Sequence, residues 1–214
     1  MPARALPCPR GEQAVYARST TFQGRPGSID AGIAFVKNEA VPMLDTLDGC
    51  RGLSLLVDRA TGQCIATSSW ESEETMRAGD AQLRPIRDRG RDILGGSMQM
   101  DEWEIVVMHR THHGECCRVT RLEGDPDAMA ETFRDRIMPG LEQMSGFCSA
   151  SLLMNRSAGL SCATTAWETR AAMEASRSWA ADMRTRAASE ADGEIIDVHE
   201  FDLAYAHLHV PEMV

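Results

Sequence analysis

The stretch that decides the fold runs from Val41 to Met76, "VPMLDTLDGCRGLSLLVDRATGQCIATSSWESEETM", because the chain contains it twice. The second copy, "MPGLEQMSGFCSASLLMNRSAGLSCATTAWETRAAM", runs from Met138 to Met173, and every residue stands 97 positions after its counterpart without a gap. Repetition on this scale predicts two copies of one structural module. The identical pairs include Pro42 with Pro139, Gly49 with Gly146, Ser54 with Ser151, Arg59 with Arg156, Thr67 with Thr164 and Trp70 with Trp167.

The match extends outward from these two segments. "YARSTTFQG" resembles "CCRVTRLEG", which places Arg18 on Arg118. "EWEIVVMHR" resembles "EFDLAYAHL", which places His109 on His207. We therefore predict that the chain is a tandem of two domains of ordinary size. The predicted parts are a flexible N-terminal segment over residues 1–13, a first domain over residues 14–111 and a second domain over residues 115–210.

Both copies predict the same order of elements. A strand rich in β-branched residues precedes an amphipathic helix, and a hairpin, a second helix and a final strand follow. Asp125 and Pro126 are a typical helix start, and Pro42 and Pro139 predict a bend late in the first helix of each copy. Pro85 predicts an interruption of the second helix in the first copy only. In the first copy the expected elements are a strand over 14–22, a helix over 28–47, strands over 52–59 and 63–70, a helix from 71 and a strand over 101–110.

The order β-α-β-β-α-β is that of ferredoxin-like folds, in which two helices cover one face of an antiparallel sheet. The other face of each sheet then needs cover, and the second copy can supply it. We therefore predict an α+β fold of two tandem ferredoxin-like domains that pack sheet against sheet.

The bulk composition excludes several classes of partner. The net charge is −10, from 32 acidic and 22 basic residues, so nucleic acids and anionic membrane surfaces would be repelled. The N-terminus lacks the apolar run of a signal peptide, and no run of 18 apolar residues predicts a membrane span. We expect a cytoplasmic protein whose seven cysteines are reduced thiols.

The most concentrated set of metal-ligating residues is "HRTHHGECC", from His109 to Cys117. Structural zinc sites need two clamps at fixed spacing, and this stretch offers only one. Cys116 and Cys117 are adjacent and would point to opposite faces of a strand. We interpret the stretch as the seam between the two domains and expect no metal site. Motifs for nucleotide, flavin or serine-hydrolase chemistry are also missing from the sequence.

The segment "GCRGLSLLVDRATGQCIATSSWESEETMRA", Gly49 to Ala78, resembles the antibiotic-biosynthesis-monooxygenase family of dimeric α+β barrels. The resemblance implies that this chain holds both halves of a barrel that members usually build as homodimers. Members include cofactor-independent oxygenases of polycyclic phenols, haem-degrading enzymes and proteins without demonstrated chemistry. The haem-degrading branch carries an Asn on the first strand and a His on the second helix, and this chain has neither.

Two histidines are the candidate catalytic residues. His109 and His207 end the last strand of each copy and are expected to act as general bases at the mouth of a pocket. Trp103 precedes His109 on one apolar face, Tyr205 precedes His207 in the same way, and both aromatic residues are expected to line the ligand pocket. The alternative interpretation is a strand-end histidine satisfied by its neighbours.

Four further residues are expected at a ligand pocket. Trp70 and Trp167 open the second helix of each copy and could wall a pocket between helices and sheet, or simply anchor the helix. Arg18 and Arg118 on the first strands could bind an anionic or phenolate ligand, or pair with an acid of the neighbouring strand.

Two functional hypotheses follow. The first is a monooxygenase without a cofactor, which binds a small apolar or aromatic molecule. The second is a non-catalytic ligand-binding or scaffold protein with a degenerate active site. The change from "WESEE" to "WETRA" in the second copy favours the first half as the functional one. A homodimer of the tandem unit remains an open prediction.

Overall fold

The computed structural model describes residues 14–213, and the predicted flexible segment, residues 1–13, lies outside them. Both halves of the chain have the same order of elements. In the first half these are β1 (Val15–Gln23), the 3₁₀ turn η1 (Pro26–Ser28), α1 (Ile29–Phe35), the π-helical turn η2 (Val36–Ala40), α2 (Val41–Leu44), β2 (Cys50–Val57), β3 (Gln63–Trp70), α3 (Glu73–Ala78), α4 (Asp80–Leu94) and β4 (Ser97–Arg110).

The second half repeats this pattern after the short connection over residues 111–115. Its elements are β5 (Cys116–Glu123), α5 (Pro126–Thr132), the π-helical turn η3 (Phe133–Ile137), α6 (Met138–Glu142), β6 (Phe147–Asn155), β7 (Leu160–Trp167), α7 (Arg170–Ala175), α8 (Arg177–Glu190) and β8 (Glu194–Leu208).

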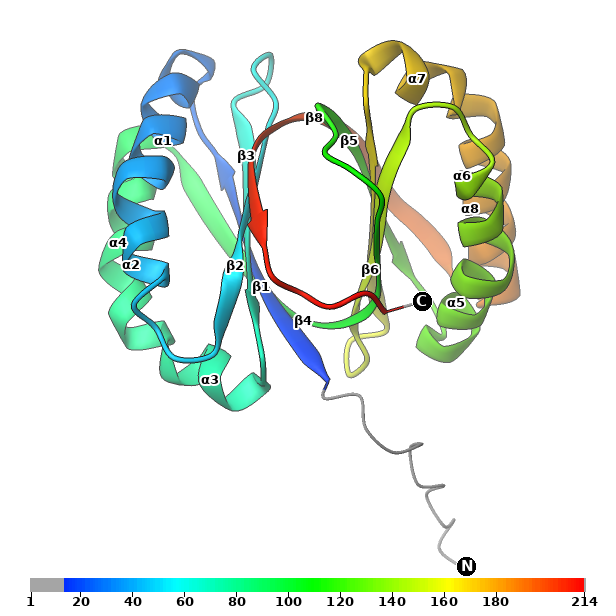
Figure 1. Ribbon diagram of the computed structural model, residues 1–214, viewed down its shortest axis with the longest axis horizontal. Coiled ribbons are helices and arrows are strands. Elements are labelled where there is room, and N and C mark those ends of the chain that lie inside the picture. The colour runs from blue at the N-terminus through cyan, green and yellow to red at the C-terminus, as the bar shows by residue number, and fades with distance from the viewer. Residues whose placement is uncertain (1–13, 214) are drawn as a thin grey trace, which may run out of the picture.

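The eight strands close into one antiparallel barrel in the order β1-β3-β2-β8-β5-β7-β6-β4. The helices of each half lie on the outer flank of their own sheet, and the two sheets face each other (Figure 1). The predicted fold class, two tandem ferredoxin-like domains in a pseudo-dimeric α+β barrel, is therefore confirmed.

The last strand of each half is shared between the two sheets. β4 pairs with β1 through Ile105 and with β6 from Glu104 to Arg110. β8 pairs in the same way, first with β5 and then with β2. A bulge breaks the register of β4 between Ile105 and Val107, and an equivalent bulge breaks that of β8 opposite Leu55 and Leu56. Bulges bend a strand and increase its twist, so they allow each long strand to pass from its own sheet into the other.

The first helix of each half contains a π-helical turn directly before its proline. In the first half this turn is η2 and Pro42 follows it, and in the second half it is η3, followed by Pro139. A wider turn accommodates a residue without a backbone N–H, so the predicted disturbance occurs at the same place in both halves. The first helical segment ends at Leu44, earlier than predicted.

The prediction that Pro85 interrupts the second helix is wrong, because Pro85 lies within α4. The break comes earlier, at Gly79 in the first half and at Ser176 in the second. Gly79 is required where it stands, since a Cβ atom there would lie 2.8 Å from the Trp70 ring. The break is thus set by packing beneath the tryptophan rather than by proline.

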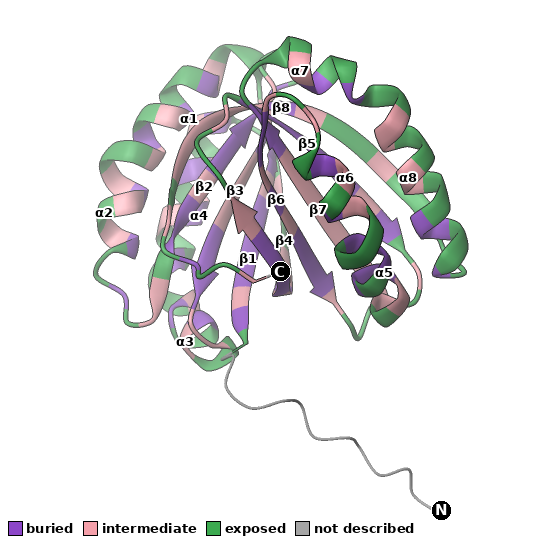
Figure 2. Cartoon of the chain, turned by 45° about the vertical axis from the view of Figure 1, so that its right-hand side comes forward, coloured by how far each residue is buried: buried purple, intermediate pink, exposed green. Residues whose placement is uncertain are grey.

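Hydrophobic cores lie between the helices and the sheet of each half, and further buried clusters lie between the two sheets inside the barrel. Buried residues follow the inner faces of the helices and the strands (Figure 2). None of the helices in residues 14–213 combines the length and the apolar character that a membrane crossing requires. The cysteines of this part of the chain are free thiols.

Candidate functional site

Trp70 and Trp167 take equivalent structural positions. Trp70 is fully buried, and its indole N–H donates to the Ser68 hydroxyl at 3.0 Å. Trp167 is 1% exposed, and its indole N–H donates to the Thr165 hydroxyl at 3.1 Å. Each indole N–H is therefore used within the protein, as the anchoring alternative requires. Trp167 also walls a pocket, which is described below.

Arg18 is buried and pairs with acidic groups, as the alternative interpretation predicted. Its guanidinium contacts Glu102 at 2.6 Å and Asp80 at 3.1 Å. Burial works to raise the pKa of Asp80, but the guanidinium of Arg87 and then that of Arg18 outweigh it, so the pKa lies below its usual value. Asp80 thus neutralises two buried arginines, since Arg87 contacts it at 2.5 Å.

Arg118 is 4% exposed and pairs with Glu200 at 3.0 Å. Its guanidinium also donates to the Ser176 hydroxyl and to the Met173 carbonyl. Hydrogen bonds from Arg177, and then from Arg118, lower the pKa of Glu200 below its usual value. Arg118 is therefore fully occupied by the protein.

The two candidate histidines do not lie in equivalent surroundings. His109 is 19% exposed and stacks on Phe147, with Glu142 and Glu212 within 3.5 Å of its ring nitrogens. His207 is exposed at the rim of the barrel, where its Nε2 lies 3.0 Å from that of His209. The catalytic role of either histidine stays a prediction.

The prediction that alternate residues of each last strand share one face up to the histidine is wrong, because a bulge shifts the alternation. Trp103 points into the space enclosed by the eight strands, which we call the barrel cavity, and its indole N–H donates to Ser19 at 2.8 Å. Beyond the bulge the alternation reverses, so Val107 packs in the helix-covered core of the second half. Tyr205 likewise packs against the helix-side core of the first half, beside Trp70.

The histidine- and cysteine-rich stretch between the two halves contains His112, whose ring makes two short contacts. The His112 Nε2 atom lies 2.9 Å from Glu168 and 3.3 Å from the Cys148 thiol. Cys116 packs on the helix side of its strand and Cys117 lines the barrel cavity, which confirms that they point to opposite faces. In residues 14–213 no three histidine, cysteine or acidic side chains are placed to hold a metal ion.

A pocket of about 60 Å³ lies between the sheet and the helices of the second half, and we call it the helix–sheet pocket. Its walls are mainly apolar, and the polar residues among those that line it include Arg118 and Arg184. The apolar lining comprises Leu122, Met129, Phe133, Ile137, Leu141, Leu152, Ala163, Trp167, Trp179, Ala180, Met183 and Ala187.

Arg184 differs from its counterpart in the first half, Arg87, which stands 97 positions earlier. Arg87 has Asp80 as its partner, but the position equivalent to Asp80 is Arg177 in the second half. Within residues 14–213 Arg184 forms no salt bridge, and burial followed by the neighbouring Arg118 lowers its pKa. The second half therefore holds a half-buried cation beside apolar walls without a carboxylate partner.

A second difference between the halves brings Trp179 to the pocket. Gly140 lies beneath Trp179, and a Cβ atom at Gly140 would be 2.3 Å from the indole ring. The equivalent pair in the first half is Met43 and Gln82. The second half thus has a glycine in place of Met43 and a tryptophan in place of Gln82. The indole ring lines the pocket because the glycine leaves room for it.

Sequence reasoning missed both Arg184 and Trp179. The signal was present in the repeat, but it lies in the differences between the copies rather than in their identities. Asp80 becomes Arg177, and Gln82 becomes Trp179, on one turn of the same helix. The helix–sheet pocket lies in the second half, whereas the sequence favoured the first half as the functional one, and that expectation stays a prediction.

Solved structures share the fold. An anthrone oxidase-like protein matches with a TM-score of 0.66 at 14% identity, over 92% of this chain and 94% of its own. A ferredoxin-fold protein from Listeria monocytogenes, described as related to antibiotic biosynthesis monooxygenases, matches with a TM-score of 0.54 at 8% identity, over 90% of this chain and 95% of its own. The fold is therefore that of the monooxygenase-like α+β barrels.

Two proteins of Mycobacterium tuberculosis are similar in sequence along nearly the whole chain. The uncharacterized protein Rv2558 is 45% identical over 219 residues, which cover 98% of this chain and 92% of that protein. The uncharacterized protein Rv2557 is 44% identical over 206 residues, which cover 94% and 92%. No family model matches the sequence.

Proposed function

We propose that this chain, which belongs to the same family as the Mycobacterium tuberculosis proteins Rv2558 and Rv2557, binds a small aromatic molecule that carries an anionic group. The binding site is the helix–sheet pocket of the second half. The observation that carries the proposal is Arg184, a half-buried arginine among the residues that line this mainly apolar pocket, which forms no salt bridge within residues 14–213.

The chemistry of the pocket selects its ligand. A guanidinium binds a carboxylate through two parallel charge-assisted hydrogen bonds, and a phenolate through charge-assisted hydrogen bonds to its single oxygen. The rings of Trp167, Trp179 and Phe133 provide flat apolar walls, against which an aromatic ring packs favourably. Arg118 adds positive potential, although its own hydrogen bonds are already made with Glu200 and neighbouring groups.

The size of the pocket limits how the ligand is seated. Its volume of about 60 Å³ is smaller than a cavity that encloses a benzene ring, which is about 150 Å³. A ligand ring therefore enters by one edge, or Trp179 and Met183 on α8 move outward as it enters. Both side chains are half-buried, so the surrounding structure restrains them only in part.

Binding without catalysis is the form of this function that we favour, and a cofactor-independent monooxygenase is the alternative. His109 lines neither the helix–sheet pocket nor the barrel cavity, and Phe147 separates it from Trp167. His207 lines the barrel cavity but not the helix–sheet pocket, in which we place the ligand. An oxygenase would need a base close enough to remove a proton from its bound substrate. Oxygen uptake with a panel of polycyclic phenols distinguishes the two forms.

The test is a calorimetric titration of the full chain with benzoate and with benzamide, its uncharged analogue. We expect the wild-type protein to bind benzoate at least tenfold more tightly than benzamide, because a charged hydrogen bond contributes about 1.5–3 kcal/mol. Arg184→Gln should remove this preference. Arg186→Gln, an exposed position on the same helix, is the matched control and should retain it.

The proposal fails if benzoate and benzamide bind the wild-type protein equally, or if Arg184→Gln keeps the preference for benzoate. Oxygen consumption that depends on added phenol would instead favour the monooxygenase.

A further inference from the structure

We infer that the barrel cavity is a second binding site, which takes an uncharged, mainly apolar molecule that bears carbonyl or hydroxyl groups. The cavity measures about 570 Å³ and is lined by residues of all eight strands. Sites for small molecules usually have volumes of about 300–1,000 Å³. This inference is independent of the helix–sheet pocket, which lies on the opposite face of the second sheet.

The cavity exists because its lining side chains are small. An eight-stranded barrel is just wide enough for side chains to fill its interior, or to hold one small ligand when they do not. Here many of the lining positions carry serine, threonine or alanine, which are too small to fill the interior. These positions are Ala17, Ser19, Ser54, Thr67, Ser69, Ser149, Ala150, Ser151, Thr164 and Ala166.

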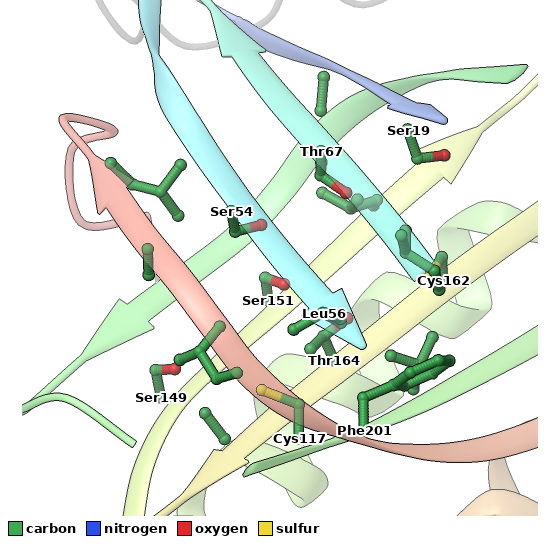
Figure 3. A pocket seen from close by; sticks show the side chains of 18 of the residues that line it. Ser19, Ser54, Leu56, Thr67, Cys117, Ser149, Ser151, Cys162, Thr164 and Phe201 are labelled. Atoms are coloured by element: carbon green, nitrogen blue, oxygen red, sulfur yellow. The ribbon is translucent and has the colours of Figure 1, made fainter. Parts of the chain in front are cut away.

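Two pairs of these hydroxyl groups occur at equivalent positions of the repeat. Ser54 on β2 corresponds to Ser151 on β6, and Thr67 on β3 corresponds to Thr164 on β7. Figure 3 shows that they extend into the cavity from strands on its two sides. A bound carbonyl group would therefore meet similar donors in either of two orientations.

The protein leaves several of these hydroxyl groups available. In residues 14–213 no side-chain hydrogen bond engages Ser54, Thr67 or Ser151, which are half-buried and line the cavity. Ser68, on the helix side of β3, accepts a hydrogen bond from Trp70. The three cavity hydroxyl groups are therefore open to water or to a ligand in the cavity.

The charged residues of the lining favour an uncharged ligand. Arg121 is paired with Asp197, with Nε at 2.9 Å from the carboxylate, and Arg110 donates to the backbone carbonyls of Leu208 and Val210. Asp101, also in the lining, would repel an anion. Neither arginine is therefore free to bind one.

Apolar side chains complete the lining and favour an organic molecule over a purely aqueous filling. They come from both halves of the chain. These residues include Leu56, Ile65, Trp103, Ile105, Met108, Val119, Leu153, Phe201 and Leu203.

The test uses fluorenone, a flat uncharged ketone, and fluorene, which has the same shape without the carbonyl group. Quenching of Trp103 fluorescence reports binding, because Trp103 lines the cavity, and Trp103→Phe identifies its signal. We expect one fluorenone per chain, bound at least tenfold more tightly than fluorene. The double variant Thr67→Val/Thr164→Val keeps the cavity volume and should remove this preference for the ketone.

A second double variant, Ser54→Leu/Ser151→Leu, fills the cavity and should abolish fluorenone binding. Thr185→Val, which lies on the exposed face of α8, is the matched control and should bind like the wild type. Circular dichroism and the melting temperature report whether each variant is folded. The inference is overturned if fluorenone does not bind the wild-type protein, if the filled and folded variant still binds it, or if the threonine variant keeps the preference. A cavity that holds only water gives the first of these results.

Discussion

Arg87 and Arg184 occupy equivalent positions in the two halves of the barrel, and within residues 14–213 Arg87 pairs with the Asp80 carboxylate whereas Arg184 forms no salt bridge. The gene repeat thus contains an internal comparison. In the first half Asp80 pairs with the buried Arg87, so this arginine has a structural role. In the second half Arg177 stands in place of Asp80, and Arg184 is available to a ligand.

The position of Trp179 should depend on the absence of a side chain at Gly140. We expect Gly140→Ala to displace the indole ring, since the added Cβ atom would lie 2.3 Å from it, and so to weaken benzoate binding severalfold. Tryptophan fluorescence and calorimetry measure the two effects. Gly27→Ala is the control, because nothing lies within 4 Å of a Cβ atom at Gly27. Unchanged benzoate affinity in Gly140→Ala would remove Trp179 from the site.

Glu200 should make stability dependent on pH in the acid range. Arg177 and then Arg118 hold its pKa below the usual value of 4.5, so its contribution is complete above pH 4.5 and is lost as the pH falls through the lower pKa of the folded state. Glu200→Gln should cost about 3 kcal/mol at pH 7, because it leaves the buried Arg118 unpaired.

Urea unfolding of wild type and Glu200→Gln at several pH values measures this effect. The difference between them should shrink as the pH falls below about 4. Glu194→Gln, at the exposed start of the same strand, should behave like the wild type throughout. A difference that stays constant with pH would show that Glu200 contributes through packing rather than through its charge.

Trp70 should be a structural residue. It is fully buried, its N–H is satisfied by Ser68, and it packs on the helices of the first half. Trp70→Ala should therefore lower the free energy of unfolding by about 3–5 kcal/mol, the usual cost of removing a buried aromatic side chain. Chemical denaturation measures it. The folded variant should still bind benzoate in the second half, and loss of that binding would mean that the two halves do not act independently.

Much of the fold could be predicted from the repeat. The order of elements, the duplication and the packing of one sheet against the other all follow from Pro42 recurring as Pro139 and Trp70 as Trp167, with hairpins between them. The exchange of the last strands could not be predicted, because it depends on bulges near Val107 and Tyr205 that leave no local mark in the sequence. Those bulges also explain why Tyr205 and His109 do not share the faces expected for them.

The candidate sites were predicted less well, for a physical reason. Arginines and tryptophans at repeated positions attract attention, yet in Arg18 and Trp70 the repetition reflects a requirement of the common fold. The available guanidinium, Arg184, depends on the loss of a partner at a neighbouring position, and the barrel cavity depends on small residues such as Ser54 and Ser151 facing each other across a closed barrel. Neither property belongs to one segment of sequence alone.

The most direct test of the account is the benzoate titration of Arg177→Asp. This substitution gives the second half the carboxylate that Asp80 provides in the first, without altering any residue that lines the helix–sheet pocket. The account predicts that the new carboxylate pairs with Arg184 and that benzoate affinity falls at least tenfold in a protein of unchanged fold. Benzoate affinity equal to that of the wild type would contradict it.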